Sequence, residues 1–147
     1  PVVTRAERLM QMMMIAAKHR LWVTNAYLVP SGAIFQLLLD KAKAGVDVRI
    51  LVPGAKSDSK PALAVQHEEY PKLLAAGIRV WEYTPSMIHS KTMLVDDELA
   101  VVGSINLDPL SLGKLEESAL VVDDRGVTAE LARQFEADTT HAHELTR

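Results

Sequence analysis

Helical stripes and short apolar runs alternate along this chain. Thr4 and Glu7 have the spacing of a capping box, and apolar residues after them recur at helical intervals, which predicts a first helix that ends near Arg20. Further helices are predicted over residues 33–44, 61–76 and about 128–142. Methionine at helical spacing usually packs in a core, and four residues of the first helix are therefore predicted to be buried: Met10, Met12, Met13 and Met14.

Short apolar runs between these helices predict strands. The runs lie at residues 21–28, 46–52, 78–83, 92–95, 99–102 and 118–122. Gly45 and Gly77 each separate a predicted helix from the next strand, which is the usual place of a glycine that caps a helix. Because helices and strands alternate, the sequence predicts an α/β fold with a mixed, largely parallel β-sheet flanked by helices on both faces. Ligands of such sheets bind beyond the strand ends.

Length and composition limit the class of protein. A chain of 147 residues that is 48% hydrophobic is long enough to form one domain with a substantial core. The absence of cysteine excludes disulfides and thiolate metal sites. No apolar run approaches the roughly 20 residues that span a bilayer. A net charge of −3 argues against broad electrostatic binding of nucleic acid, so we expect no nucleic-acid partner.

Polar side chains gather at the ends of the strands predicted at 92–95 and 99–102. Because side chains alternate along a strand, His89 and Lys91 point the same way. Ser104 and Asn106 share a face for the same reason if the strand geometry continues. An imidazole, an ammonium, a hydroxyl and a carboxamide that converge on one point suit a phosphate ester.

These residue types define a chemistry. A neutral imidazole at His89 can attack phosphorus and form a covalent phosphohistidine. Lys91 and Asn106 would stabilise the charge on the non-bridging oxygens. Glu117 could accept a hydrogen bond from the second ring nitrogen of His89 and fix its tautomer. No metal and no cofactor are needed, but a general acid for the leaving oxygen is missing.

Three other positions allow more than one interpretation. Tyr27 and the loop at 53–60 follow predicted strand ends, so Tyr27 either lines the substrate pocket or packs half-buried with its hydroxyl in solvent. The Ser104 hydroxyl either contacts phosphate or bonds to the backbone of a turn. Asp96 lies an odd number of residues after Lys91, and a regular strand would turn it to the opposite face. We therefore expect Asp96 to support the turn or the neighbouring backbone.

The polar residues also resemble a known family. His89, Lys91 and Asp96 match the H-x-K-x-x-x-x-D motif of the phospholipase D superfamily, and residues 103–106 match its G-S-x-N motif. Within that superfamily the chain is most similar to the C-terminal half of bacterial cardiolipin synthases, on these stretches: 25–30, 44–50 and 88–92.

The resemblance implies a divided active site. His89 would be the nucleophile, assisted by the other members of the catalytic set: Lys91, Asn106, Glu117 and Asp96. In the family, two such motifs from two halves of a chain or from two subunits form one site, and the second histidine is the general acid. Since residues 1–147 contain one motif, we expect a single domain excised from a two-motif chain and carrying half a site.

Two positions depart from the family pattern. Leu110 stands where the family commonly carries an arginine, and Leu115 where it often has an asparagine. The residues expected to contact phosphate are unaffected. The changes bear instead on how the following loop is anchored and which head group it accepts.

The activity implied by the resemblance is phosphatidyl transfer between two phosphatidylglycerol molecules. Such a parent protein would associate with the cytoplasmic face of the cell membrane, whereas we expect this fragment itself to remain in solution. The second half would come from the same chain or from a homodimer. Alternatives are a phospholipase D hydrolase, a dimeric one-motif phosphodiesterase or nuclease, and a non-catalytic half. His141 and His143 do not share a helix face, so we expect no metal site there.

Overall fold

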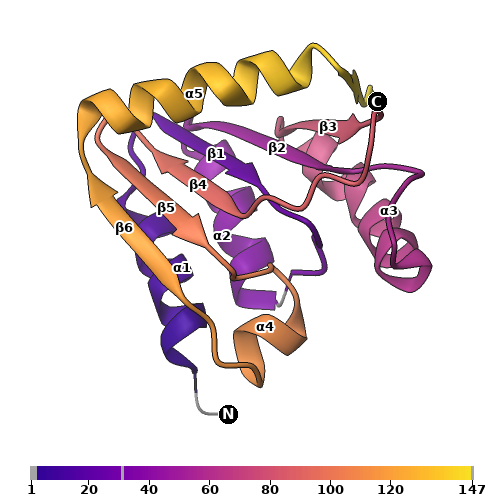
Figure 1. Cartoon of the computed structure of the whole chain (residues 1–147), viewed down its shortest axis with the longest axis horizontal. Coiled ribbons are helices and arrows are strands. Elements are labelled where there is room, and N and C mark those ends of the chain that lie inside the picture. Colours follow the sequence, from indigo (N-terminus) through magenta and orange to yellow (C-terminus); the bar gives the residue numbers. More distant parts are fainter. Residues whose placement is uncertain (1–2, 31, 147) are drawn as a thin grey trace.

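One sheet organises the part of the chain that the computed structural model describes, residues 3–30 and 32–146 (Figure 1). The strands are β1 (Arg20–Thr24), β2 (Asp47–Pro53), β3 (Arg79–Tyr83), β4 (Thr92–Val95), β5 (Leu99–Gly103), β6 (Ala119–Asp123) and β7 (Ala142–Glu144). The helices are α1 (Arg5–Ala16), α2 (Gly32–Lys43), α3 (Lys60–Ala75), α4 (Pro109–Gly113) and α5 (Arg125–Thr139). The strand order across the sheet is β6-β5-β4-β1-β2-β3-β7.

The sheet is mixed, which confirms the predicted α/β class. β1, β2 and β3 pair in parallel, because helices connect them in the manner of βαβ units. The pairs β1–β4, β4–β5, β5–β6 and β3–β7 are antiparallel. The parallel part is therefore smaller than predicted. Short connections in the second half of the chain, such as the turn at 96–98 between β4 and β5, allow antiparallel neighbours that no crossover helix has to join.

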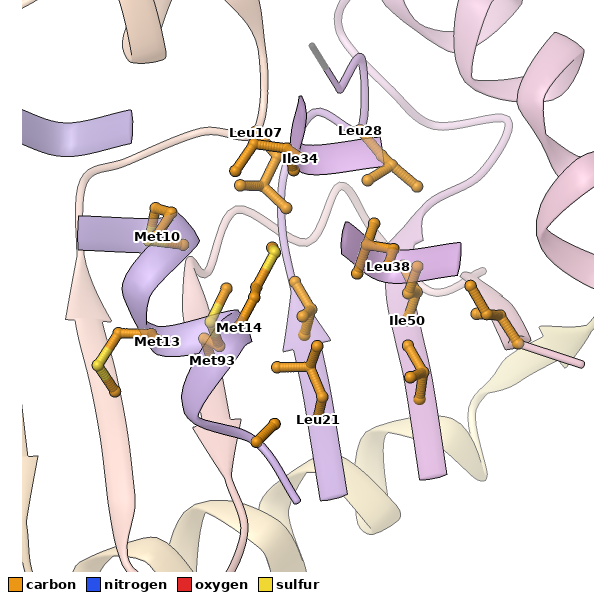
Figure 2. Packing of buried hydrophobic residues seen from close by; sticks show 14 of the residues in the cluster. Met10, Met13, Met14, Leu21, Leu28, Ile34, Leu38, Ile50, Met93 and Leu107 are labelled. Atoms are coloured by element: carbon orange, nitrogen blue, oxygen red, sulfur yellow. The ribbon is translucent and has the colours of Figure 1, made fainter. Parts of the chain in front are cut away.

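Helices cover both faces of the sheet, also as predicted. Buried residues of α1, α2 and α3 pack on one face, and Ala132 and Phe135 of α5 pack on the other. Figure 1 shows α5 lying across the sheet on the side away from α1 and α2. In the close view of the first core, Met14 of α1 lies beside Met93 of β4 (Figure 2). The predicted core role of the methionines holds for Met10, Met13 and Met14, whereas Met12 is exposed.

Local sequence signals explain most helix boundaries. Thr4 caps α1 by accepting a hydrogen bond from the Glu7 amide at 3.1 Å. Gly45 and Gly77 follow α2 and α3 with φ of 89° and 87°, a conformation that glycine adopts without a steric penalty. The first helix ends at Ala16 rather than near Arg20, because the chain there enters β1. α4 and β7 were not predicted.

Candidate functional site

The polar residues meet at one edge of the sheet. β4 runs antiparallel to β1, so the start of β4 lies beside the end of β1, where the parallel strands β2 and β3 also end. His89 and Lys91 precede β4, Tyr27 follows β1, and Ser104 follows β5. This is the edge at which ligands of parallel sheets bind.

His89 and Lys91 contact each other directly. The Nζ atom of Lys91 lies 2.8 Å from Nδ1 and 3.4 Å from Nε2 of His89, and it donates to the His89 carbonyl at 2.7 Å. The imidazole is exposed. Both side chains line an open depression of about 610 Å³ that is also lined by Ser90, Thr92, Val102, Gly103, Ser104, Asn106 and Glu117.

The surroundings of Lys91 shift the pKa of its ammonium group. Partial burial lowers the pKa of Lys91, because burial disfavours the charged form. The nearby carboxylates of Glu117 and Asp58 raise the pKa and offset part of this effect. Lys91 therefore lies within the electrostatic influence of two acidic groups.

Ser104 and Glu117 form a second contact within the depression. The Ser104 hydroxyl donates to Oε2 of Glu117 and accepts from the Ser118 amide at 3.0 Å. The predicted hydrogen bond from His89 to Glu117 is not made; among the described residues, the Glu117 carboxylate is bonded to Ser104. The register between β5 and β6 explains this contact, since it places Ser104 opposite Ser118, next to Glu117.

Gly103 of the G-S-x-N stretch allows this close approach. A Cβ atom at Gly103 would lie 2.2 Å from the Ser118 carbonyl oxygen and 2.7 Å from the Ala119 Cα. Both are backbone atoms, which cannot move aside as a flexible side chain can. A glycine is required here because the β6 backbone passes directly over it.

Asn106 lies in the depression, and Asn25 fixes the segment that carries it. The buried Asn25 side chain donates to the Ile105 carbonyl at 3.1 Å and accepts from the Leu107 amide at 3.0 Å. These bonds hold the backbone on both sides of Asn106. The side-chain oxygen of Asn106 is buried without a hydrogen-bond partner among the described residues, as are the hydroxyls of Ser111 and Thr128 outside the depression.

Tyr27 stands next to His89. The two rings are edge to face, with centroids 6.1 Å apart. The Tyr27 hydroxyl donates to Oδ1 of Asp58 at 2.7 Å, and this bond together with burial raises the pKa of Tyr27 to about 12. Tyr27 is thus a neutral donor at neutral pH. It connects the loop after β2 to the segment beside His89.

Asp96 lies at the other end of β4, away from the depression. Its carboxylate accepts from the backbone amides of Lys18, His19 and Arg20 at 2.7–3.1 Å. The structure therefore does not bring Asp96 to the other motif residues, and its contacts are those of a backbone support, as the alternation of side chains predicted. Burial raises the pKa of Asp96, but the three amide bonds outweigh this and hold the pKa below its usual value.

Replacing Asp96 by alanine is expected to lower the free energy of unfolding by about 2–3 kcal/mol at pH 7. The change removes charge-assisted hydrogen bonds to the backbone and puts alanine at φ 52°, where aspartate is better tolerated. Urea denaturation measures the difference. Because the folded pKa is depressed, the contribution of Asp96 is present above its unfolded pKa of about 3.9 and is lost as the pH falls through the folded value.

Asp97 provides the matched control. Its side chain is exposed and pairs with Arg20 at 3.1 Å, and exposed ion pairs contribute little. Asp97→Ala should change the stability by less than about 0.5 kcal/mol. Asp96 would not support the backbone in this way if both variants lost the same free energy of unfolding. The same conclusion would follow if the stability difference between Asp96→Ala and the unchanged chain stayed constant in acid.

Two contributing residues were missed in the sequence. Asp58 influences Lys91 and bonds Tyr27, and Asn25 holds the Asn106 segment. Asn25 follows the end of β1 directly, and Asp58 lies in the loop after β2. This position after a strand end is the sequence pattern that could have identified both residues. Outside this site, the Nε2 atom of His67 lies 2.7 Å from Oε1 of Glu82 on β3.

Comparison with known proteins assigns the chain to a family. Residues 10–139 match the family described as "Cardiolipin synthase, PLD-like domain", and the chain belongs to this phospholipase D-like family. It is 34% identical over 131 residues to cardiolipin synthase A of Pseudomonas putida, covering 89% of this chain and 27% of that protein. It is 39% identical over 117 residues to cardiolipin synthase A of Klebsiella pneumoniae, covering 80% and 24%. The chain thus spans about a quarter of each relative's length.

Solved structures share the fold. The phospholipase D family member Nuc from Salmonella typhimurium superposes with a TM-score of 0.82 at 19% identity, over 95% of this chain and 90% of Nuc. The phosphatidylserine synthase of Haemophilus influenzae superposes with a TM-score of 0.74 at 18% identity, over 94% of this chain and 36% of the synthase. In the described part of the chain, no helix is long and apolar enough to cross a bilayer.

Proposed function

We propose that this chain is one catalytic half of a phosphatidyltransferase of the cardiolipin synthase type. The observation that carries the proposal is the direct contact between His89 and Lys91 in a depression shared with Asn106, Ser104 and Glu117. The family membership supports a phospholipid as the substrate. Phosphatidylglycerol supplies the phosphodiester, and its glycerol head group is the leaving group.

The reaction has two displacements at phosphorus. A ring nitrogen of His89 attacks the phosphorus of one phosphatidylglycerol, the bond to the head-group oxygen breaks, and glycerol leaves with a proton from a general acid. The hydroxyl of a second phosphatidylglycerol then attacks the phosphorus and gives its proton to the same group, which now acts as the general base, and the phosphorus–nitrogen bond breaks. The products are cardiolipin and glycerol, and His89 is restored.

The neighbouring side chains have separate roles in these steps. Lys91 and Asn106 stabilise the charge on the non-bridging phosphate oxygens in both transition states. The Glu117 carboxylate accepts a hydrogen bond from Ser104 and so positions the Ser104 side chain at the rim of the depression. Asp96 supports the site from a distance, because it anchors the far end of β4, the strand that follows Lys91. Tyr27 positions the imidazole ring by edge contact.

A second phospholipase D-like half completes the site in this proposal. The residues of the depression include no free general acid for the leaving oxygen, since Glu117 is bonded and Lys91 is needed as a cation. An apolar patch adjoins the depression: Val102 and Leu120 pair across β5 and β6 and are 39% and 64% exposed. Exposed apolar patches mark interaction surfaces. The second half, from the parent chain or a second subunit, covers this patch, and the parent protein binds the membrane.

Product analysis tests the proposed function. The complete parent protein is incubated with vesicles of phosphatidylglycerol labelled in the head group and in the acyl chains. Transfer releases labelled glycerol and places acyl label in cardiolipin, whereas hydrolysis by water gives phosphatidic acid. Cleavage of a DNA oligonucleotide instead of the lipid would support the phosphodiesterase alternative and end the lipid proposal. Formation of phosphatidic acid without cardiolipin would be compatible with attack by His89. It would show that water, and not a second phosphatidylglycerol, is the acceptor.

A further inference from the structure

An apolar groove opens beside the candidate site. Its volume is about 440 Å³, and it lies between the start of α3 and the helix α4. The lining residues are Val29, Pro61, Ala62, Val65, Asp108, Pro109, Leu110 and Lys114. Leu110, where the family pattern has an arginine, is 53% exposed on this groove.

Three backbone segments lead from the site into this groove. Tyr27, beside His89, lies two residues before Val29. Asn106, in the depression, lies two residues before Asp108. Asp58, bonded to Tyr27, lies three residues before Pro61. Since two residues of chain span at most roughly 7 Å, each wall of the groove begins within about 7–11 Å of a site residue.

Backbone hydrogen bonds join the first two segments, those that contain Val29 and Asp108. Leu28 and Leu107 form a parallel bridge, and the Val29 amide donates to the Leu107 carbonyl at 2.9 Å. Both leucines are fully buried below the surface. The groove and the depression are therefore fixed relative to each other by backbone hydrogen bonds.

The charged residues leave the groove apolar. The Asp108 carboxylate caps α4 by accepting from the Ser111 amide at 2.8 Å, which engages its charge at the helix start. Lys114 lies at the end of α4, and its long aliphatic stem can cover apolar surface while the ammonium stays in water. What remains toward the groove is mainly aliphatic: Val29, Pro61, Ala62, Val65, Pro109 and Leu110.

We propose that this groove binds an acyl chain of the phospholipid whose phosphate reaches His89. This inference rests on the proposed function, because a groove whose walls begin within about 7–11 Å of a phosphate site is within reach of what is covalently attached to the phosphate. An aliphatic lining selects the hydrocarbon part of that molecule. Leu110 then has a role that an arginine could not fill, since a guanidinium would have to lose water to line the groove.

A photoreactive lipid tests the groove directly. The complete parent protein is mixed with detergent micelles that contain phosphatidylglycerol carrying a diazirine midway along one acyl chain, illuminated, and digested for peptide mass spectrometry. The label is expected on residues 61–65 and 108–114. Leu110→Arg should lower that labelling about tenfold, which corresponds to the transfer energy of roughly two buried methylene groups.

Ile15→Arg is the matched control. Ile15 is 58% exposed on α1, outside the groove, and is as accessible as Leu110. Its replacement should leave the labelling pattern unchanged, and circular dichroism checks that both variants are folded. Label on β6 or spread over the surface, or equal labelling in Leu110→Arg and the unchanged chain, would overturn the assignment. So would chemical cross-links that place a second protein half over the groove.

The outcome is separable from that of the proposed function. The probe reports where the acyl chain lies and needs no turnover. If the parent protein makes no cardiolipin but the label maps to the groove, the proposed transfer reaction is wrong and the proposed acyl-chain contact is confirmed. If cardiolipin forms but the label maps elsewhere, only the assignment of the groove to the acyl chain is wrong.

Discussion

His89→Ala in the complete parent protein is expected to lower the rate of phosphatidyl transfer by at least about 10⁴-fold and to abolish the covalent lipid adduct. A covalent mechanism divides one difficult displacement into two easier ones, and alanine provides no nitrogen to attack phosphorus. Lys91, the side chain in contact with His89, is a charged ammonium rather than a nucleophile. The measurement is acid-quenched trapping of lipid labelled in the acyl chain, followed by peptide mapping.

His19→Ala is the control for this variant. His19 is exposed, precedes β1, and lies at the opposite edge of the sheet near Asp96. Its loss should leave turnover and adduct formation within twofold of the unchanged enzyme. Trapping of a full amount of lipid by His89→Ala would remove the nucleophile assignment, and an adduct mapped to the other half of the parent would move the nucleophile there.

Lys91→Met is expected to lower kcat by about 10²–10³-fold with a smaller effect on KM. Methionine keeps much of the side-chain volume but removes the positive charge that, in the proposed mechanism, stabilises the phosphate oxygens as charge develops. Lys91 also donates to the His89 carbonyl at 2.7 Å, so the variant also removes a hydrogen bond within this loop. Steady-state kinetics on phosphatidylglycerol, together with a melting curve, separate the two effects.

Two further variants sharpen this test. Lys91→Arg keeps the charge and should recover part of kcat, because the guanidinium is a cation of different shape. Lys43→Met removes an exposed lysine at the end of α2 and should leave kcat unchanged. A fall in melting temperature that accounts for the whole loss in Lys91→Met, with no recovery in Lys91→Arg, would assign Lys91 to structure rather than to charge stabilisation.

Local patterns predicted the parts of the molecule that depend on neighbouring residues. The alternation of side chains placed His89 and Lys91 together, and they are in contact. The same alternation turned Asp96 away from them, and Asp96 binds backbone at the far end of β4. Helix spacing and glycine positions predicted the helices and strands other than α4 and β7 to within a few residues, because caps and periodicity act over short distances.

Contacts between distant segments could not be predicted in the same way. The bonds from Asn25 to the Asn106 segment, from Tyr27 to Asp58, and from Ser104 to Glu117 depend on strand order and register. Sequence patterns leave both undetermined, since a strand of given composition can pair with several partners. β7 was missed because its three residues carry no alternation long enough to recognise.

The bonds from Asn25 have a consequence for biosynthesis. They join positions that are 82 residues apart, from Asn25 to Leu107. Early parallel units can assemble from contacts that are close in sequence, and such contacts form fastest. The rim that carries Asn106 cannot close until Leu107 has left the ribosome. Part of the hydrophobic core shares this delay, because Met93 and Leu107 belong to the same buried cluster as residues of α1 and β1.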